Sequence, residues 1–180
     1  PYRAPDSSRP AKSNDPSTWA TYAEAVAAAE VSNSGIGLML SPADDDFRIV
    51  AFDLDDCRDP ENGEAARWAQ ELIDEANSYT EITPSGTGFR IIGIGGTHKL
   101  HTTLPRPDGG HVEVFSQSNR YITISGDHVD GTPEDLNNID DLILRHKKER
   151  DQPKQKTTSS TMVPQRSKVP TPRLRALVED

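Results

Sequence analysis

Apolar and polar positions divide this chain into short apolar runs and stretches with helical spacing. Runs rich in Ile, Val, Leu and Phe, bounded by Gly, Pro, Ser or Asp, are typical of strands. They predict strands at residues 36–40, 48–54, 79–83, 89–94, 111–115 and 121–125. Apolar residues at a spacing of three or four predict an amphipathic helix over 60–77. Further helices are expected from about Pro16 to residues 32–35 and from Pro133 to about Arg150.

The connections between these segments indicate the fold class. The acidic turn 44–46 is expected to join the first two strands as a hairpin, and turns at 84–88 and 117–119 are expected to join later pairs. Residues 95–110, rich in Gly, His and Pro, are expected to form a loop. Because short loops favour antiparallel pairing, the sequence predicts an α+β fold with a mainly antiparallel sheet.

Composition separates one folded domain from a tail. Residues 151–173 are dominated by Gln, Lys, Ser, Thr and Pro, which bury too little apolar surface to fold. We therefore expect a domain at 1–148 and a basic linker at 149–180 that leads to a further domain. Because the chain begins with Pro1, we also expect residues upstream of it.

Charge and cysteine content restrict the classes of function. The net charge is −9, and it is divided between −14 for residues 1–145 and +5 for residues 146–180. An acidic body with a basic tail suits metal binding in one part and phosphate contact in the other, although solvation alone also explains the division. The single cysteine, Cys57, excludes a disulfide framework and a four-cysteine zinc site. With no long apolar run, we expect a cytoplasmic protein without membrane contact.

Three carboxylates are candidates for chemistry. Asp53 and Asp55 end an apolar strand, and strand alternation places both on the face opposite Leu54. Neighbouring carboxylates repel one another unless a cation lies between them, and oxygen ligands suit Mg²⁺ or Mn²⁺. Glu113 lies between two valines of another strand, where it faces either a metal or solvent. Taken alone, Asp-x-Asp is more often a strand that ends in a polar turn.

A glycine-rich loop lies between the two acidic segments. Gly86 and Gly88 let the backbone approach an anion, Ser85 and Thr87 add hydroxyl donors, and Arg90 adds a charged fork for a triphosphate. The alternative is an ordinary hairpin loop, which the short Ser-Gly-x-Gly pattern does not exclude.

Together, the ordered motifs resemble the archaeo-eukaryotic primase superfamily, most closely the primase-polymerase domains of phages and plasmids. The motifs run over most of the first 145 residues and are 53–55, 85–91, 112–114 and 120–126. This resemblance implies an RRM-like sheet flanked by helices and nucleotidyl transfer from NTP or dNTP on a single-stranded DNA template. A helicase domain in the same full-length chain is expected as a partner.

Residue by residue, the resemblance assigns Asp53, Asp55 and Glu113 to a site for two Mg²⁺ or Mn²⁺ ions. The nucleotide-binding positions that it implies are Ser85, Gly86, Thr87, Gly88, Arg90 and Arg120. Arg90 departs from the family, which commonly has a histidine there in contact with the phosphates of the incoming nucleotide. Arginine also binds phosphate, but it does not titrate near neutral pH.

Two other functions use the same residues. A degenerate module of this fold would bind nucleotide or single-stranded DNA for the helicase, and a nuclease would use the same acids with a nearby lysine. No lysine follows Glu113 closely, so the nuclease ranks last. Cys57 and the histidines could also supply zinc ligands, but the pair His98 and His101 lacks partners at finger spacing. We therefore interpret them as loop histidines.

Overall fold

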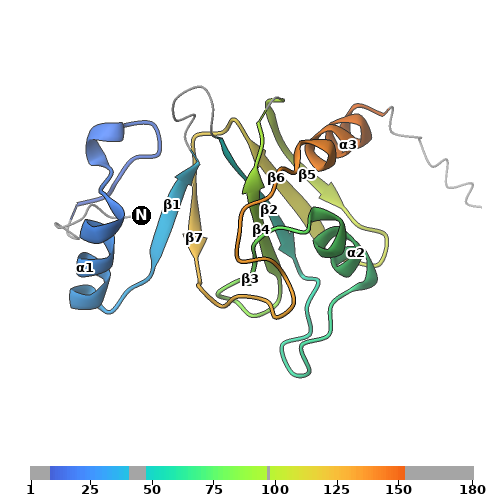
Figure 1. The fold of residues 1–180 in the computed structure, drawn as a ribbon, viewed down its shortest axis with the longest axis horizontal. Helices are drawn as coiled ribbons and strands as arrows, with labels where there is room; N and C mark the ends of the chain where they lie inside the picture. The colour runs from blue at the N-terminus through green and yellow to red at the C-terminus, as the bar shows by residue number, and fades with distance from the viewer. Residues whose placement is uncertain (1–8, 41–47, 97, 153–180) are drawn as a thin grey trace, which may run out of the picture.

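A five-stranded antiparallel sheet forms the centre of the molecule (Figure 1). The computed structural model describes residues 9–40, 48–96 and 98–152. The strand order is β3-β4-β2-β6-β5, and every neighbouring pair is antiparallel. The strands are β2 (Ile49–Asp55), β3 (Thr80–Ile82), β4 (Phe89–Ile94), β5 (Leu100–Pro105) and β6 (His111–Ser116). These pairings confirm the predicted α+β class with a mainly antiparallel sheet.

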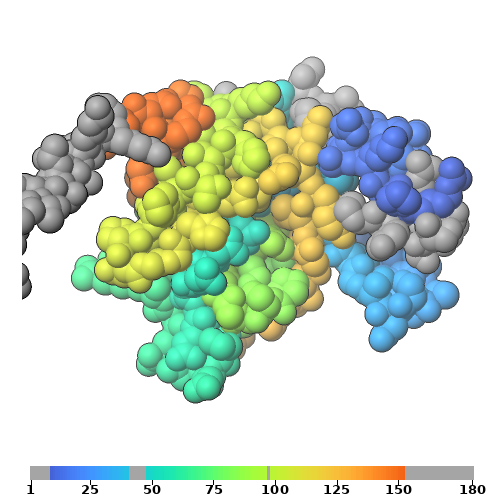
Figure 2. Space-filling view, turned by 180° about the vertical axis from the view of Figure 1, so that it is seen from behind, coloured from blue at the N-terminus to red at the C-terminus, as the bar shows by residue number. Residues whose placement is uncertain are grey.

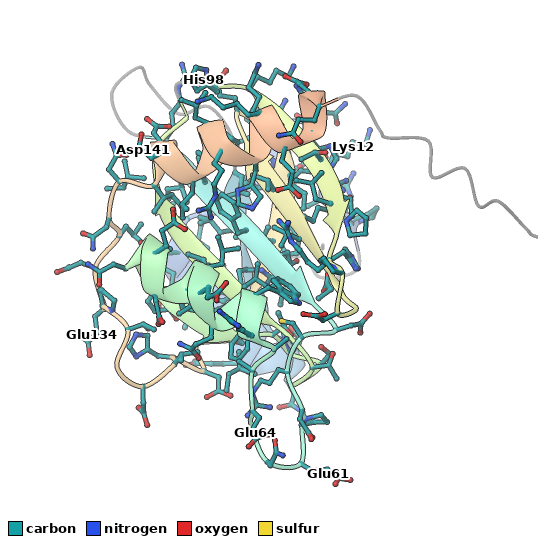
Figure 3. All side chains as sticks on the ribbon, turned by 90° about the vertical axis from the view of Figure 1, so that its right-hand side faces the viewer. Lys12, Glu61, Glu64, His98, Glu134 and Asp141 are labelled. Carbon is teal, nitrogen blue, oxygen red and sulfur yellow. The ribbon has the colours of Figure 1, made fainter. Side chains whose placement is uncertain are left out.

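Helices α2 (Arg67–Ala76) and α3 (Asp140–Asp151) cover one face of this sheet (Figures 1 and 3). Strand alternation turns Val50, Phe52 and Leu54 of β2 toward these helices, and all three side chains are fully buried. Helix α2 buries one apolar stripe, whose members are Ala69, Leu72, Ile73 and Ala76. This side of the sheet therefore holds the larger hydrophobic core.

A second, two-stranded sheet lies beyond the other face (Figure 1). It consists of β1 (Ile36–Leu40) and β7 (Arg120–Ile124) in antiparallel pairing. Its buried side chains join a smaller core with residues of the large sheet, namely Leu40, Ala51, Ile92, Phe115 and Ile122. Helix α1 (Tyr22–Ser32) flanks this pair and buries none of its own residues. The face of the large sheet that carries Asp53 and Asp55 is therefore the face turned toward β1 and β7.

Two predicted hairpins are wrong. β1 pairs with β7 rather than with β2, and β6 pairs with β2 and β5 rather than with β7. β2 lies at the centre of the large sheet with β4 and β6 as neighbours, so neither of its edges is open to β1. The acidic turn 44–46 lies outside the described residues.

The predicted elements were otherwise found with shifted bounds. The loop expected over 95–110 is wrong for residues Leu100–Pro105, which form strand β5. An exposed edge strand needs little apolar character, and the sequence LHTTLP has little. Helix α2 begins seven residues later than expected, since a bridge between Arg58 and Ala65 closes a turn ahead of it. Helix α3 begins at Asp140, and residues Pro16–Thr18 form a separate 3₁₀ turn before α1.

Helix length also bears on membrane contact. Among the described helices, none combines the length and the apolar character needed to span a bilayer. The expected linker at 149–180 lies largely outside the described residues, beyond the end of α3.

Candidate active site

One row of residues crosses the whole five-stranded sheet on the face turned toward β1 and β7. Strand register places Glu81 opposite Arg90, Arg90 opposite Asp53, Asp53 opposite Glu113, and Glu113 opposite Thr103. Directly opposed residues in antiparallel strands have neighbouring side chains. The row therefore gathers three carboxylates and one guanidinium contributed by β3, β4, β2 and β6.

Asp53 and Arg90 form an ion pair at the centre of this row. Arg90 Nη2 donates to Asp53 Oδ2 at 2.7 Å, and Nη1 of the same guanidinium donates to the carbonyl oxygen of Thr123 in β7. The Arg90 side chain is only 8% exposed. The second oxygen, Asp53 Oδ1, is buried and has no hydrogen-bond partner among the described residues. A buried oxygen that lacks a donor is a natural point of contact for a cation.

Asp55 lies two residues farther along β2, on the same face and nearer to solvent. His111 Nε2 lies 3.1 Å from Asp55 Oδ2, as the register of β2 with β6 requires. Burial raises the pKa of the Asp55 carboxyl above its usual range, and the negative charge of Asp53 raises it further, whereas His111 acts in the opposite direction. Two carboxylates that repel one another in this way are stabilised by a cation held between them.

Glu113 has two basic neighbours from different strands. His101 Nε2 of β5 lies 3.0 Å from Glu113 Oε1, and Arg120 Nη2 of β7 lies 3.5 Å from the same oxygen. Both basic side chains also contact the Phe115 ring, with Arg120 Cζ 5.4 Å and the His101 ring centroid 5.3 Å from its centroid. The structure therefore brings Arg120 beside Glu113.

The glycine-rich loop joins β3 to β4 and is held by its own hydroxyl groups. The Ser85 hydroxyl lies 3.1 Å from that of Thr83 and 3.0 Å from that of Thr87. Gly86 has a φ of +76°, which favours glycine. A Cβ at Gly88 would collide with the carbonyl oxygen of Leu54, so this glycine lets the loop pack against the end of β2. Backbone conformation thus explains the glycine at position 86, and close packing explains the one at position 88, without any role in phosphate binding.

The loop also approaches the acids through the segment that follows β2. Backbone amides of Cys57 and Arg58 both donate to the carbonyl oxygen of Thr87 at 3.0 Å, and Arg58 Nη1 donates to Gly86 O at 2.8 Å. The loop is therefore fastened to the chain only two residues beyond Asp55. Figure 2 shows the teal end of β2 at the surface between green and yellow segments.

Sequence patterns missed several residues of this site. Glu81 and Arg58 were not singled out, although a hairpin around loop 83–88 would already pair Glu81 with Arg90. His101 was interpreted as a loop histidine but lies in β5, and His111 lies in β6 as expected; both contact the acids, which the sequence patterns did not indicate. His98 lies at the end of the molecule opposite the loop that carries Glu61 and Glu64 (Figure 3).

Cys57 is not suited to ligate a metal. It is buried, its thiol donates to the carbonyl oxygen of Leu54 at 3.3 Å, and burial raises the pKa of the thiol to about 12. At neutral pH the thiol therefore stays protonated, whereas a metal ligand needs the thiolate.

The carboxylate oxygens of the three acids suit a divalent cation in their chemistry, and each acid is paired with a base. Within residues 9–40, 48–96 and 98–152, no three His, Cys, Asp or Glu side chains already surround one point as a metal site would. The unpartnered Asp53 Oδ1 and the raised pKa of Asp55 are nevertheless features that a hard cation would relieve.

Taken together, the antiparallel α+β sheet and its acidic face are compatible with a primase-polymerase type of domain. No family model matches the chain. The chain is, however, 35% identical over 149 residues, 80% of its length, to a protein named DNA Primase-polymerase from Nitratiruptor phage NrS-1. This similarity supports the assignment of the chain to the primase-polymerase family, as the ordered motifs predicted. The matched region makes up 20% of the phage protein, so the chain spans about a fifth of that relative.

Proposed function

We propose that this domain catalyses metal-dependent nucleotidyl transfer as a DNA primase or polymerase in phage or plasmid replication. The observation that carries the proposal is the placement of Asp53, Asp55 and Glu113 on one face of adjacent strands β2 and β6. The similarity to a phage DNA primase-polymerase supports the choice of this reaction among those that use paired carboxylates. The substrates would be NTP or dNTP and a single-stranded DNA template.

In this proposal, the three acids hold two Mg²⁺ or Mn²⁺ ions. Such ions lower the pKa of an attacking 3′-hydroxyl and stabilise the leaving pyrophosphate. Asp53 would bind through its unpartnered Oδ1, because Oδ2 already accepts a hydrogen bond from Arg90. Asp55 and Glu113 would exchange their contacts with His111 and His101 for the cations. The imidazoles then remain next to the site as hydrogen-bond donors.

Nucleotide binding is proposed for Ser85, Gly86, Thr87 and Gly88, with Arg90 and Arg120. Arg120 is the better placed of the two arginines, since its side chain is 48% exposed and lies beside Glu113. Arg58 adds a third guanidinium next to Gly86. An anionic triphosphate needs such cations because the neighbouring acids repel it.

A primer-extension assay tests the proposal. The protein would be incubated with a single-stranded template, labelled nucleoside triphosphates and Mn²⁺ or Mg²⁺, with or without a primer. We expect incorporation that needs the metal and falls at least about a hundredfold in Asp55→Asn, because a lost ligand removes several kcal/mol of transition-state stabilisation. Asp108→Asn is the matched control, since Asp108 is an exposed acid in the turn before β6. Full activity in Asp55→Asn would refute the assignment.

A second candidate is a module that binds nucleotide or single-stranded DNA without chemistry. It is favoured by the ion pair of Arg90, whose guanidinium is turned to Asp53 and Thr123 rather than outward. It would serve a helicase domain elsewhere in the full-length chain. A mobility shift without incorporation would support this module, and shortening of the DNA would indicate a nuclease instead.

A further inference from the structure

Glu81 is a fully buried carboxylate at the end of the charged row. It lies in β3, opposite Arg90, and is 0% exposed. Its Oε1 lies 3.9 Å from Arg90 Nη1, the guanidinium nitrogen that also donates to Thr123 O. A carboxylate is removed from water only at a large cost in free energy unless charges and donors surround it. The free-energy cost of burying Glu81 therefore has to be offset by hydrogen-bond donors and a positive charge next to it.

Three donors hold this carboxylate in place. Backbone amides of Ser125 and Gly126 donate to Oε1 and Oε2 at 3.0 and 3.1 Å, and the Tyr79 hydroxyl donates to Oε2 at 3.1 Å. Gly126 reaches this position with a φ of +73°. Burial and the charge of Glu81 raise the pKa of Tyr79 to about 12, so the phenol remains a donor. All three contacts are hydrogen bonds that the carboxylate oxygens accept.

The guanidinium of Arg90 thus lies between two carboxylates. It contacts Asp53 at 2.7 Å and Glu81 at 3.9 Å, with side-chain exposures of 17% and 0% for the two acids. With Asp53 as its one anionic partner, Arg90 would neutralise an acid that is needed to bind a cation. Glu81 adds a second carboxylate on the far side of Arg90, so Asp53, Arg90 and Glu81 together carry a net negative charge.

We propose that Glu81 is a positioning residue for the acidic site. It holds Arg90 from the side away from Asp53 and balances its charge, so that Asp53 stays oriented and remains able to bind a divalent cation. This inference rests on the proposed metal-dependent function. Glu81 also ties the site to β7, because Ser125 and Gly126 follow directly after the strand that carries Arg120.

Direct binding of Mn²⁺ to the whole chain, without nucleotide or DNA, tests the proposal. Free Mn²⁺ would be measured by electron paramagnetic resonance for the wild type and Glu81→Gln, and thermal unfolding would show that both are folded. We expect Mn²⁺ affinity to fall about tenfold or more in Glu81→Gln, as with other residues that support metal ligands. Both the lost negative charge and the stronger hold of Arg90 on Asp53 act in this direction.

Two control variants separate charge from packing. Glu134→Gln makes the same chemical change at an exposed position and should bind Mn²⁺ as the wild type does. Tyr79→Phe removes one hydrogen bond to Glu81 but no charge, so its affinity should change less than about threefold. If Glu81→Gln does not fold, Glu81→Asp keeps the charge but withdraws it from Arg90, and its Mn²⁺ affinity should still fall measurably.

The outcomes distinguish this inference from the proposed function. Unchanged Mn²⁺ affinity in folded Glu81→Gln would overturn it and leave Glu81 as a link between β3 and residues 125–126. A wild type that binds no Mn²⁺ would overturn it together with the metal-dependent function. Mn²⁺ binding that depends on Glu81, in a protein that incorporates no nucleotide, would support the inference and refute the polymerase.

Discussion

At the scale of single residues, one ionisable side chain, that of His146, is buried on the helix-covered side of the sheet rather than in the charged row. His146 of α3 is 2% exposed, packs edge-on against Phe52 at a ring-centroid distance of 5.1 Å, and donates from Nδ1 to Leu142 O at 2.8 Å. Burial lowers the pKa of His146 below its usual value, and the nearby charges of Arg106 and Arg145 lower it further, while the hydrogen bond with Leu142 and the charge of Glu149 act in the opposite direction. His146 is therefore held in its neutral form.

This lowered pKa makes the stability of the fold depend on pH. Below the ordinary histidine pKa of 6.5, the unfolded chain binds a proton at residue 146, whereas the folded protein does not yet bind one there. The contribution of His146 is thus complete above pH 6.5 and is lost as the pH falls toward the lowered pKa. We expect a loss of about 1.4 kcal/mol in the free energy of unfolding for each unit by which the pKa is lowered.

Urea unfolding of the wild type and His146→Gln between pH 5 and 8 measures this dependence. The two proteins should differ less at pH 5 than at pH 8, because the variant has no proton to take up at this position. All other side chains are the same in both proteins, so their effects cancel in the difference. A constant difference across the range would contradict a lowered pKa for His146.

Residue identity alone predicted part of the site. Strand alternation was enough to place Asp53 and Asp55 on one face, because a two-residue period needs no knowledge of neighbouring strands. The partners could not be obtained in this way, since the contacts of Asp53 with Arg90 and of Asp55 with His111 depend on the register of β2 with two other strands. Whether these residues bind metal and nucleotide remains a prediction.

At the scale of elements, the junction of β1 with β7 depends on one small residue. A Cβ at Gly37 would collide with the Tyr121 ring and with the carbonyl oxygen of Ile122, which belongs to the backbone and cannot swing away. We expect Gly37→Ala to lower the free energy of unfolding by about 1–3 kcal/mol, as overpacking does elsewhere. Urea denaturation followed by circular dichroism would measure this change.

Gly35 provides the control on the same segment. A Cβ there would meet no atom within 4 Å, so Gly35→Ala should change the free energy of unfolding by less than about 0.5 kcal/mol. Equal effects of the two substitutions would indicate that helix and strand propensity, rather than the contact with β7, sets the cost. Nucleotide incorporation should fall in Gly37→Ala as well, since β7 carries Arg120.

The elements themselves were easier to predict than their pairing. Apolar runs located β1, β2, β4, β6 and β7, because burial on a sheet needs the same residue types in every topology. The pairing of β1 with β7 joins segments some 80 residues apart, and nothing local in either sequence indicates the partner. The wrong hairpins followed from the assumption that strands adjacent in sequence are also adjacent in space.

At the scale of the whole molecule, charge is divided along the chain. Among the described residues, both hydrophobic cores lie between Leu40 and Ile143. Residues 153–180 carry six basic and two acidic side chains, so their removal would lower the net charge from −9 to −13. Residues 1–152 are thus more acidic than the whole chain and repel DNA more strongly.

A comparison of chains 1–180 and 1–152 tests what the basic segment contributes. Both should unfold at the same temperature, because each contains the two cores. Binding to single-stranded DNA should be weaker for 1–152, and its salt dependence should be shallower by up to about 4 in the slope of log K against log salt, since each of six lost cations releases about 0.7 counterions. Fluorescence anisotropy at several salt concentrations gives both slopes. Equal slopes would show that DNA binds to residues 1–152 alone, where Arg120 lies beside Glu113 and Arg58 beside the glycine-rich loop.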